Sequence, residues 1–455
     1  MKYITAKQAL MPQGWENNVC VGIDPDGMIS HVGRLQSQDA RQVDLLLPAP
    51  ANLHSHTFQR AMAGLTETRG PDAGDNFWTW RKLMYRFLGQ LNPEHIEAIA
   101  TLVFMEMLEA GFASVAEFHY LHHGQDGIPY AKLSETSERI VSAAETAGIG
   151  LTLLPVFYQY GGCDKRPLEG GQRRFGNDLE QFLRLHEGAA STVNNSLADY
   201  SIGVAPHSLR AVDPDGLNAA TSLCPAGPVH LHLAEQVAEV SEFEQYFATR
   251  PTNWLLDNHD IDERWTLIHC TQMTESETDR LAQSGAVAGL CPLTEANLGD
   301  GIFNGTQYLN AGGKIGIGSD SNIHITLFEE LKMLEYSQRL RDRSRAALAT
   351  TRKSTGRVLF EQTLSGGAQA AKRNSGAIKP GLFADLIGIE TDNQWLCNQQ
   401  GDASLDKLIF TGYGQSCITD LWSAGRHVVK NGKHIKSEMI IRNFKNAIAG
   451  LGNDL

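Results

Sequence analysis

The feature that most constrains the fold is a regular alternation of short apolar strands and helical segments through the middle of the chain. A typical helical segment starts at Asn92-Pro93 and keeps apolar residues at helical spacing up to Gly111. We expect eight strands, the first in the apolar run that begins at Leu45 and ends at His54 and His56, and the others at residues 113–118, 151–157, 202–205, 229–233, 265–268, 286–290 and 314–318. Repeated strand–helix units with short connections produce parallel strands, and eight of them close into a barrel. The sequence therefore predicts an α/β protein with a (β/α)8 TIM-like barrel.

Both ends of the chain have a different pattern, which is typical of β-structure. A hairpin is expected around the turn at 24–27, and strand-like runs occur at 386–389, 407–410, 420–422 and 427–430. Neither end alone has enough strands to bury a face. We therefore expect three parts: a small β-sandwich domain from residues 1–48 and 375–435, the barrel from 49–374, and a C-terminal helix at 436–455.

Charge and composition exclude several classes of protein. The net charge of −13 and the pI near 5.7 argue against a sequence-independent nucleic-acid binder and against attachment to anionic membranes. The first residues lack a signal-peptide pattern, and no apolar run approaches the roughly 20 residues of a membrane span. The seven cysteines are scattered without a Cys-x-x-Cys pair, which indicates neither a disulfide framework nor a thiolate zinc site. We expect a cytoplasmic protein.

The first expected barrel strand ends in His54-Ser55-His56. Side chains alternate faces along a strand, so the two imidazoles point the same way and lie close enough to bind one ion. Two surface histidines at a strand end would have the same spacing. The interpretation as half of a metal site therefore depends on further ligands elsewhere in the barrel.

Further ligands follow other barrel strands, where the carboxyl ends of all eight converge. The candidates, each able to bind a metal or to transfer a proton, are His232 and Glu235 after strand five, His269 after strand six and Asp320 after strand eight. Taken singly, His269 is also compatible with a buried core histidine, and Asp320 with a helix cap. His230 is interpreted as structural, because His232 lies nearer the strand end.

These residues resemble the amidohydrolase superfamily over the whole chain, including Gly-Leu-Phe-Ala-Asp-Leu at 381–386. The string His-Leu-Ala-Glu-Gln at 232–236 is similar to that of its mononuclear deaminases. Three longer and more specific strings, at 52–65, 291–301 and 334–342, resemble the formimidoylglutamate deiminases of histidine degradation. The resemblance implies hydrolysis of N-formimino-L-glutamate to N-formyl-L-glutamate and ammonia. One departure is Asn322, where members of that group carry His.

The donor set itself indicates the chemistry. Three imidazoles and one carboxylate, from His54, His56, His232 and Asp320, suit one Zn²⁺ or another divalent cation, with a water whose pKa falls to about 7. No lysine follows strand four to bridge a second metal. Asp320 would also accept the proton of the water, His269 would orient the water, and Glu235 would transfer a proton to the departing nitrogen.

A dicarboxylate substrate requires cationic or hydroxyl donors near the barrel mouth of this acidic protein. Arg210, after strand four, is the leading candidate for a bidentate contact. The positions that resemble the binding residues of the family are Gln59, Arg81, Tyr120 and His207. Each also has a structural interpretation: Arg81 as a solvated side chain and Gln59 as a loop-bracing amide. His119, His122 and His123 are interpreted as loop histidines.

Two further functions remain open from the sequence. The first is a deaminase of another amidine, a guanidino acid or a nucleobase. The second belongs to a different class, a non-catalytic metal-bound binding protein on a barrel scaffold. The retention of both Glu235 and His269 favours catalysis. The expected partner is a small-molecule dicarboxylate, and the resemblance leaves a homodimer open.

Overall fold

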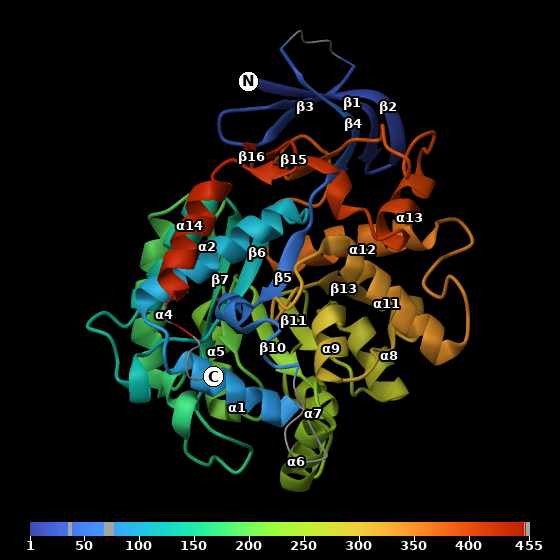
Figure 1. Ribbon diagram of the computed structural model, residues 1–455. Helices are drawn as coiled ribbons and strands as arrows, with labels where there is room; N and C mark the ends of the chain where they lie inside the picture. Colours follow the sequence, from blue (N-terminus) through green and yellow to red (C-terminus); the bar gives the residue numbers. More distant parts are fainter. Residues whose placement is uncertain (35–38, 68–76, 450, 452–455) are drawn as a thin grey trace.

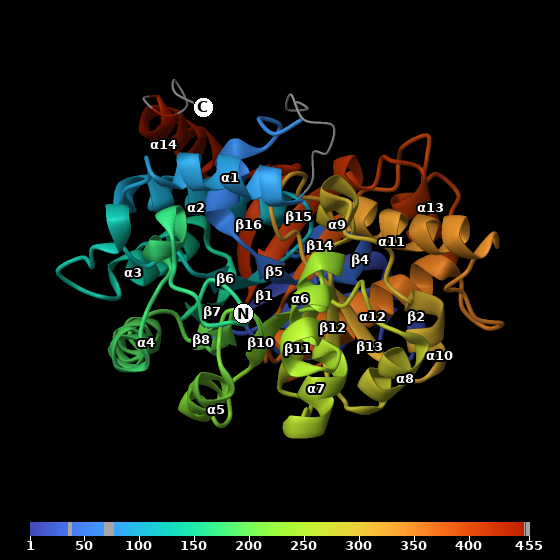
Figure 2. The ribbon, with the colours of Figure 1, turned by 90° about the horizontal axis from the view of Figure 1, so that it is seen from below.

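The computed structural model describes residues 1–34, 39–67, 77–449 and 451, with side chains from Trp80 onward after the second gap. Its centre is a ring of parallel strands surrounded by helices (Figure 2). The strands are β5 (Ala51–Ser55), β6 (Ser114–His119), β7 (Gly150–Phe157), β8 (Ser201–Ile202), β9 (Ala205–Pro206), β10 (Val229–Leu233), β11 (Trp265–His269), β12 (Val287–Leu290) and β13 (Lys314–Ile317). The predicted barrel is confirmed.

Isolated bridges close the ring between two continuous runs of strands. Strands β5 to β8 form one parallel sheet and β10 to β13 another. Val204 pairs with Val229 and Ser208 with His232 at one seam, and Ser55 pairs with Asp320 at the other. The second seam brings the ends of the first and last barrel strands side by side. Closure of the barrel therefore places residues 54–56 next to Asp320.

The helices cover the outside of the barrel. Their bounds are α1 (Phe77–Leu88), α2 (Pro93–Glu109), α3 (Glu135–Ala147), α4 (Leu179–Asn194), α5 (Pro214–Leu223), α6 (Val237–Phe247), α7 (Pro251–Asn258), α8 (Glu275–Gln283), α9 (Pro292–Leu298), α10 (Gly305–Asn310), α11 (Leu327–Asp342) and α12 (Thr355–Ala370). Helix α2 begins as predicted, since the Asn92 side chain accepts from the His95 N–H and Pro93 occupies the first turn. No helix in the described part of the chain is long and apolar enough to cross a membrane.

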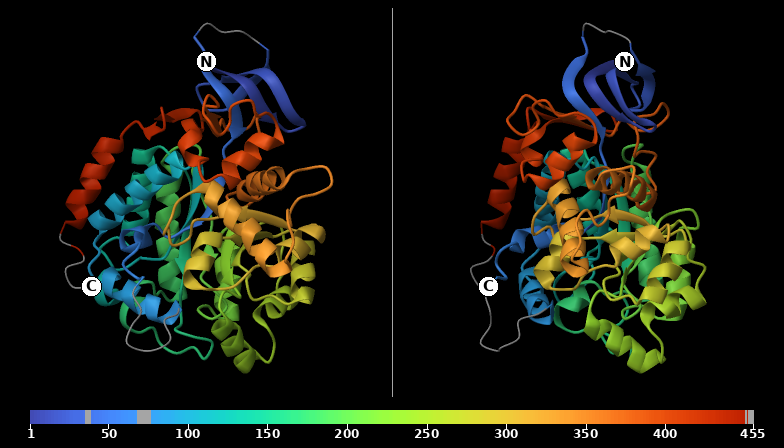
Figure 3. Two further views of the ribbon diagram at one scale, coloured as in Figure 1. Left: turned by 45° about the vertical axis from the view of Figure 1, so that its right-hand side comes forward. Right: turned by 90° about the vertical axis from the view of Figure 1, so that its right-hand side faces the viewer.

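A terminal β-sheet domain stands on one end of the barrel (Figures 1 and 3). It is one eight-stranded sheet in the order β17-β16-β15-β14-β4-β1-β2-β3, so strands from both ends of the chain lie side by side. Their bounds are β1 (Lys2–Met11), β2 (Gly14–Ile23), β3 (Ile29–Gly33), β4 (Arg41–Pro48), β14 (Leu386–Ile389), β15 (Ile418–Ser423), β16 (Arg426–Lys430) and β17 (Lys433–His434). The exact limits of the three expected parts stay a prediction.

Two strand predictions differ from the structure. Residues 407–410 belong to helix α13 (Asp402–Phe410), not to a strand. The buried residues Leu405, Leu408 and Ile409 recur at helical spacing, and the run at 407–410, with three apolar residues after Lys407, was too short to show this period. The fourth barrel strand is interrupted, with Gly203 and Val204 lying between β8 and β9. A side chain at Gly203 would meet the Pro228 carbonyl 2.5 Å away, so only glycine fits this break.

The expected C-terminal helix is α14 (Ser437–Ile448), which packs along α2 (Figure 1). Ile440 of α14 is buried against Leu102 and Met105 of α2. An amphipathic helix of this kind is held by one apolar stripe. Residue 450 and residues 452–455 of the predicted segment lie outside the described part of the chain.

Candidate active site and metal centre

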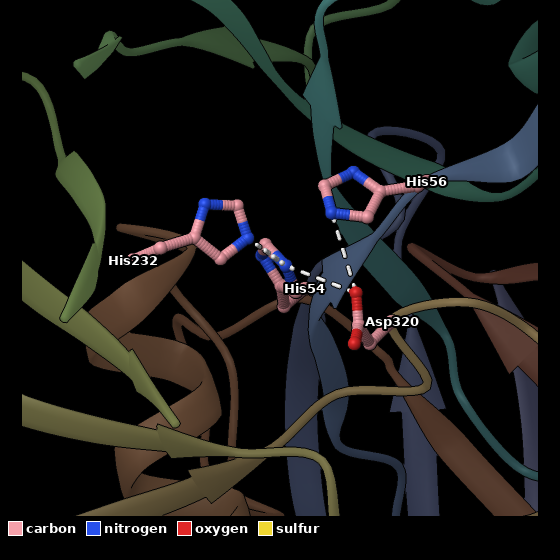
Figure 4. A group of neighbouring side chains, drawn as sticks. All are labelled: His54, His56, His232 and Asp320. Atoms are coloured by element: carbon pink, nitrogen blue, oxygen red, sulfur yellow. Dashed lines mark hydrogen bonds and ion pairs between the residues drawn. The ribbon is translucent and has the colours of Figure 1, made fainter. Parts of the chain in front are cut away.

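Four buried side chains converge at the carboxyl ends of the barrel strands (Figure 4). His54 lies in β5, His56 just after it, His232 in β10, and Asp320 just after β13. The Asp320 Oδ1 atom is 3.4 Å from His54 Nε2 and 3.2 Å from His56 Nε2. The Nε2 atoms of His54 and His232 are 3.2 Å apart. We call these four residues the metal cluster.

Backbone carbonyls orient two of the three imidazoles. His56 Nδ1 lies 3.0 Å from the Phe118 carbonyl, and His232 Nδ1 lies 3.0 Å from the His207 carbonyl. A carbonyl accepts, so each Nδ1 carries the proton and each Nε2 presents a lone pair to the centre of the cluster. Burial lowers the pKa of His54 to about 3 and also lowers the pKa values of the other two imidazoles. All three are therefore neutral at pH 7.

The metal cluster fits a divalent cation. One ligand atom from each of the four residues lies within 4.8 Å of the others, and all four residues are buried. Burial alone would raise the pKa of Asp320, but the hydrogen bond with His54 and the nearby imidazoles outweigh it and lower this pKa. Three neutral imidazoles and one carboxylate are the donors that Zn²⁺ prefers. The chain supplies the ligand set that its sequence predicts.

Asn322 ties the two sides of the metal cluster together. It is fully buried, and its amide nitrogen donates to Ser55 Oγ and the His56 carbonyl, both at 3.2 Å, and to the Asp320 carbonyl at 3.1 Å. Its amide oxygen accepts from Ser319 Oγ at 2.6 Å. The sequence marked Asn322 as a departure from the resembling group, and this network could not be derived from sequence because Ser55 and His56 are distant from Asn322 in the chain.

Glu235 and His269 lie beside the metal cluster. His269 Nε2 is 3.9 Å from Glu235 Oε1 and 3.9 Å from Asp320 Oδ2, and its Nδ1 is 3.3 Å from Glu295 Oε1. Burial would lower the pKa of His269, but the carboxylates, Glu235 foremost, raise it well above its usual value. Burial raises the pKa of Glu235 to about 7. A carboxyl group with such a pKa can both give and accept a proton near neutral pH.

Glu239, in the first turn of α6, holds the backbone that presents Glu235. Its Oε2 accepts from the Glu235 N–H at 3.0 Å. Glu295 similarly accepts from the Cys291 N–H at 2.8 Å while it contacts His269. Sequence reasoning did not single out either carboxylate. Glu239 lies three residues after Gln236 in a capping box, which is the signal that could have identified it.

One pocket brings the predicted substrate residues next to the metal cluster. Gln59, Arg81, Tyr120, His207 and Arg210 all line it, as do His56, His232, Glu235, His269 and Asp320. Trp80, Met84, Tyr85, Tyr158, Phe175 and Leu298 also line the pocket and were not predicted. These side chains come from loops and helices whose approach to the barrel mouth has no local sequence signal. The assignment of individual roles stays a prediction.

Tyr158 Oη connects the two arginines of the pocket. It lies 2.9 Å from Arg81 Nη2 and 3.3 Å from Arg210 Nη1. Arg210 is only 8% exposed and forms no ion pair with any carboxylate among the described residues. A buried cation without a counter-ion is costly unless a ligand supplies one. The pocket therefore suits an anionic group.

The structural interpretation of the remaining histidines agrees with their contacts. His230 Nε2 lies 2.9 Å from the Ala370 carbonyl, away from the metal cluster. His119 contacts Thr136 Oγ1, His122 contacts the Val156 carbonyl, and His123 contacts the Gly176 carbonyl, each at 2.9 Å. His122 and His123 lie in the loop after β6, as predicted, whereas His119 is the last residue of β6 and contacts α3. None of them lines the pocket.

Comparisons with known proteins match the chain over nearly its whole length. The pattern of the Amidohydrolase family matches residues 45–433. Formimidoylglutamate deiminase of Pseudomonas aeruginosa is 45% identical over 458 residues, which cover 99% of this chain and 100% of that protein. The crystal structure of an amidohydrolase from Brucella melitensis is 48% identical, with a TM-score of 0.94 over 99% of both chains. Atrazine chlorohydrolase of Arthrobacter aurescens TC1, solved with zinc, shares the fold, with a TM-score of 0.84, 19% identity and coverage of 98% and 100%.

Proposed function

The chain belongs to the amidohydrolase family, and we propose that it is a metal-dependent formimidoylglutamate deiminase that converts N-formimino-L-glutamate into N-formyl-L-glutamate and ammonia. The relative at 45% identity over its full length has this activity in its name. The metal cluster and the pocket beside it provide the two parts that the reaction needs, a hydrolytic centre and a site for an anionic substrate.

The observation that most supports this substrate is the buried Arg210 guanidinium beside Glu235 and the metal cluster, which forms no ion pair with a carboxylate in the part of the chain that the structure describes. A guanidinium binds a carboxylate through two parallel hydrogen bonds. N-formimino-L-glutamate carries two carboxylates and one amidine, so a carboxylate at Arg210 leaves the amidine for the metal cluster. Gln59, Arg81, Tyr120 and His207 complete the proposed substrate contacts.

The cation that we assign to His54, His56, His232 and Asp320 is Zn²⁺, although another divalent cation suits the same donors. When bound, it supplies Lewis acidity and lowers the pKa of water to about 7. Asp320 accepts the proton of the attacking water. His269 orients that water and stabilises the negative charge that develops on the amidine carbon's new oxygen.

Glu235 then delivers a proton to the departing nitrogen. The amide ion NH₂⁻ is too poor a leaving group to depart unprotonated, so the C–N bond breaks only after this transfer. Water adds to the amidine carbon, the terminal nitrogen leaves as ammonia, and the formyl amide remains. The pKa of about 7 matches Glu235 to this transfer at neutral pH. Glu239 keeps the Glu235 backbone in place.

Two alternatives make different predictions. A deaminase of a guanidino acid or of a nucleobase would share the metal cluster, but a neutral nucleobase would leave Arg210 without a counter-ion. A non-catalytic metal-binding protein does not need a carboxyl group with a raised pKa next to its metal cluster, and Glu235 is such a group. A homodimer stays a prediction.

An ammonia-release assay on the zinc-loaded protein tests the proposal. The panel contains N-formimino-L-glutamate, a guanidino acid, guanine and cytosine, and we expect turnover of the first alone. Arg210→Met should raise KM by about 100-fold because it removes a bidentate contact to a carboxylate. The control Arg184→Met removes an exposed arginine of α4 that pairs with Glu180 and should change nothing. Turnover of a nucleobase instead, or an unchanged KM in Arg210→Met, would reject the substrate.

A further inference from the structure

Tyr158 is the point where three parts of the chain meet in the pocket. It follows β7 and is fully buried. Its phenolic oxygen accepts from Arg81 Nη2 at 2.9 Å, from Arg210 Nη1 at 3.3 Å and from Gln172 Nε2 at 3.4 Å. Arg81 belongs to α1, Gln172 to the 3₁₀ helix η3 (Gly170–Arg174), and Arg210 to the loop after β9.

These contacts use only the acceptor capacity of Tyr158. A phenol has two lone pairs and one hydrogen, and the three donors already compete for the lone pairs. The Tyr158 hydroxyl donates its own hydrogen to no atom among the described residues. A buried donor without an acceptor is costly unless a ligand supplies one. The hydroxyl hydrogen is therefore available to the anion that the arginines attract.

We propose that Tyr158 is a substrate-binding residue that holds Arg81 and Arg210 around one carboxylate of the substrate and donates its own hydrogen to that carboxylate. The inference rests on the proposed function and deepens it, because it assigns a hydroxyl donor that selects a carboxylate. A neutral group of similar size would accept this hydrogen but would leave the buried Arg210 guanidinium, which forms no ion pair among the described residues, without a counter-ion.

The charged groups around Tyr158 make its ionisation, and with it the affinity for the substrate, dependent on pH. The groups that face Tyr158 are Arg81 and Tyr85 from α1, and His207 and Arg210 after β9, with the neutral Gln172 from η3. Burial would raise the pKa of Tyr158, but the charges of Arg210 and Arg81 outweigh it and lower the pKa to about 8.

The neutral hydroxyl donates a hydrogen, whereas the ionised one has none and repels the carboxylate. Substrate affinity therefore falls as the pH rises through about 8. A bound carboxylate disfavours the ionisation in the complex. The loss should consequently appear in kcat/KM, which reports the free enzyme, and not in kcat.

Tyr158→Phe tests the proposal, with Tyr200→Phe as the matched control. Tyr200 is also buried, its hydroxyl has no hydrogen-bond partner among the described residues, and it lies outside the pocket. Measurements of kcat and KM for N-formimino-L-glutamate from pH 6 to 10 should show KM raised about 10- to 100-fold in Tyr158→Phe. We expect kcat within about twofold of the wild type, and the fall of kcat/KM near pH 8 should disappear.

Tyr200→Phe should keep the wild-type profile, and all three proteins should be folded and bind the same amount of zinc. An unchanged KM in Tyr158→Phe, with the fall near pH 8 retained, would overturn the inference while leaving the proposed function intact. Absence of wild-type turnover would instead reject the proposed function. If Tyr158→Phe does not fold, 3-fluorotyrosine at position 158 provides the test. The fluorine lowers the phenol pKa, so the fall should move to lower pH, and an unmoved fall would refute the assignment.

Discussion

Replacement of Asn322 by alanine should weaken both the fold and the metal site. The substitution removes a fully buried carboxamide and its four hydrogen bonds to Ser55, His56, Asp320 and Ser319. Two of these partners keep other bonds: the Asp320 carbonyl accepts from the His56 N–H at 2.9 Å, and the His56 carbonyl accepts from the Gln59 N–H at 3.0 Å. The Ser319 hydroxyl, however, loses the acceptor of its hydrogen.

The magnitude follows from these contacts. A buried polar group left unsatisfied costs about 1–3 kcal/mol. Asn322 also has φ of +56°, a left-handed conformation that costs alanine roughly 1 kcal/mol more than asparagine. Together these effects predict a loss of about 2–4 kcal/mol in the free energy of unfolding. The affinity for Zn²⁺ should fall about 10- to 100-fold, as for other residues that orient metal ligands.

Two measurements on the same protein test this prediction. Urea denaturation of the metal-free protein gives the change in stability, and competition with a chromophoric chelator gives the Zn²⁺ affinity. The control is Asn304→Ala, because Asn304 donates to the Met273 carbonyl at 3.1 Å and to Thr278 Oγ1 at 3.0 Å outside the pocket. It should lose stability and keep its Zn²⁺ affinity. Equal Zn²⁺ affinities in the wild type and Asn322→Ala would refute the reasoning.

Further predictions concern proton transfer and acid stability. Glu235→Gln should keep one equivalent of zinc and lose about 10²- to 10⁴-fold in kcat, because it removes the proton carrier but no metal ligand; full activity would contradict this role. Asp420→Asn should destabilise the protein at neutral pH. Burial would raise the pKa of Asp420, but hydrogen bonds from His427 and Arg41 hold it below its usual value. Its stabilising contribution is thus present above about pH 4 and disappears as the pH falls through the folded-state pKa. Acid titrations of unfolding should show the two proteins converging below pH 4, and a constant difference would contradict the assignment.

The barrel could be predicted because its strands are visible in the sequence as local runs of apolar residues. Buried parallel strands are continuous apolar runs, and the polar residue that follows each run marks the catalytic edge. His54, His56, His232 and Asp320 were identifiable in this way, and the structure brings them together. The helix at 402–410 was missed because the three apolar residues at 408–410 do not distinguish the period of a helix from that of a strand.

The contacts of Tyr158 and Asn322 depend instead on the closed ring. Tyr158 meets residues that are 77 positions before it and 52 after it, and Asn322 meets residues more than 260 positions away. No local sequence pattern predicts contacts between residues that are so far apart in the chain. A phenol after a strand and an asparagine after a metal-binding aspartate have many structural uses, and only the folded chain shows which groups they contact.

The most direct test of the account is product analysis by NMR during hydrolysis of N-formimino-L-glutamate by zinc-loaded protein. We predict one N-formyl-L-glutamate and one ammonia for each substrate consumed, and no conversion after the metal is removed by a chelator. Activity should return when Zn²⁺ is added back. Formation of formamide and L-glutamate would show that the other C–N bond breaks, and conversion that persists without metal would show that the cluster is not the hydrolytic centre; either result would contradict the account.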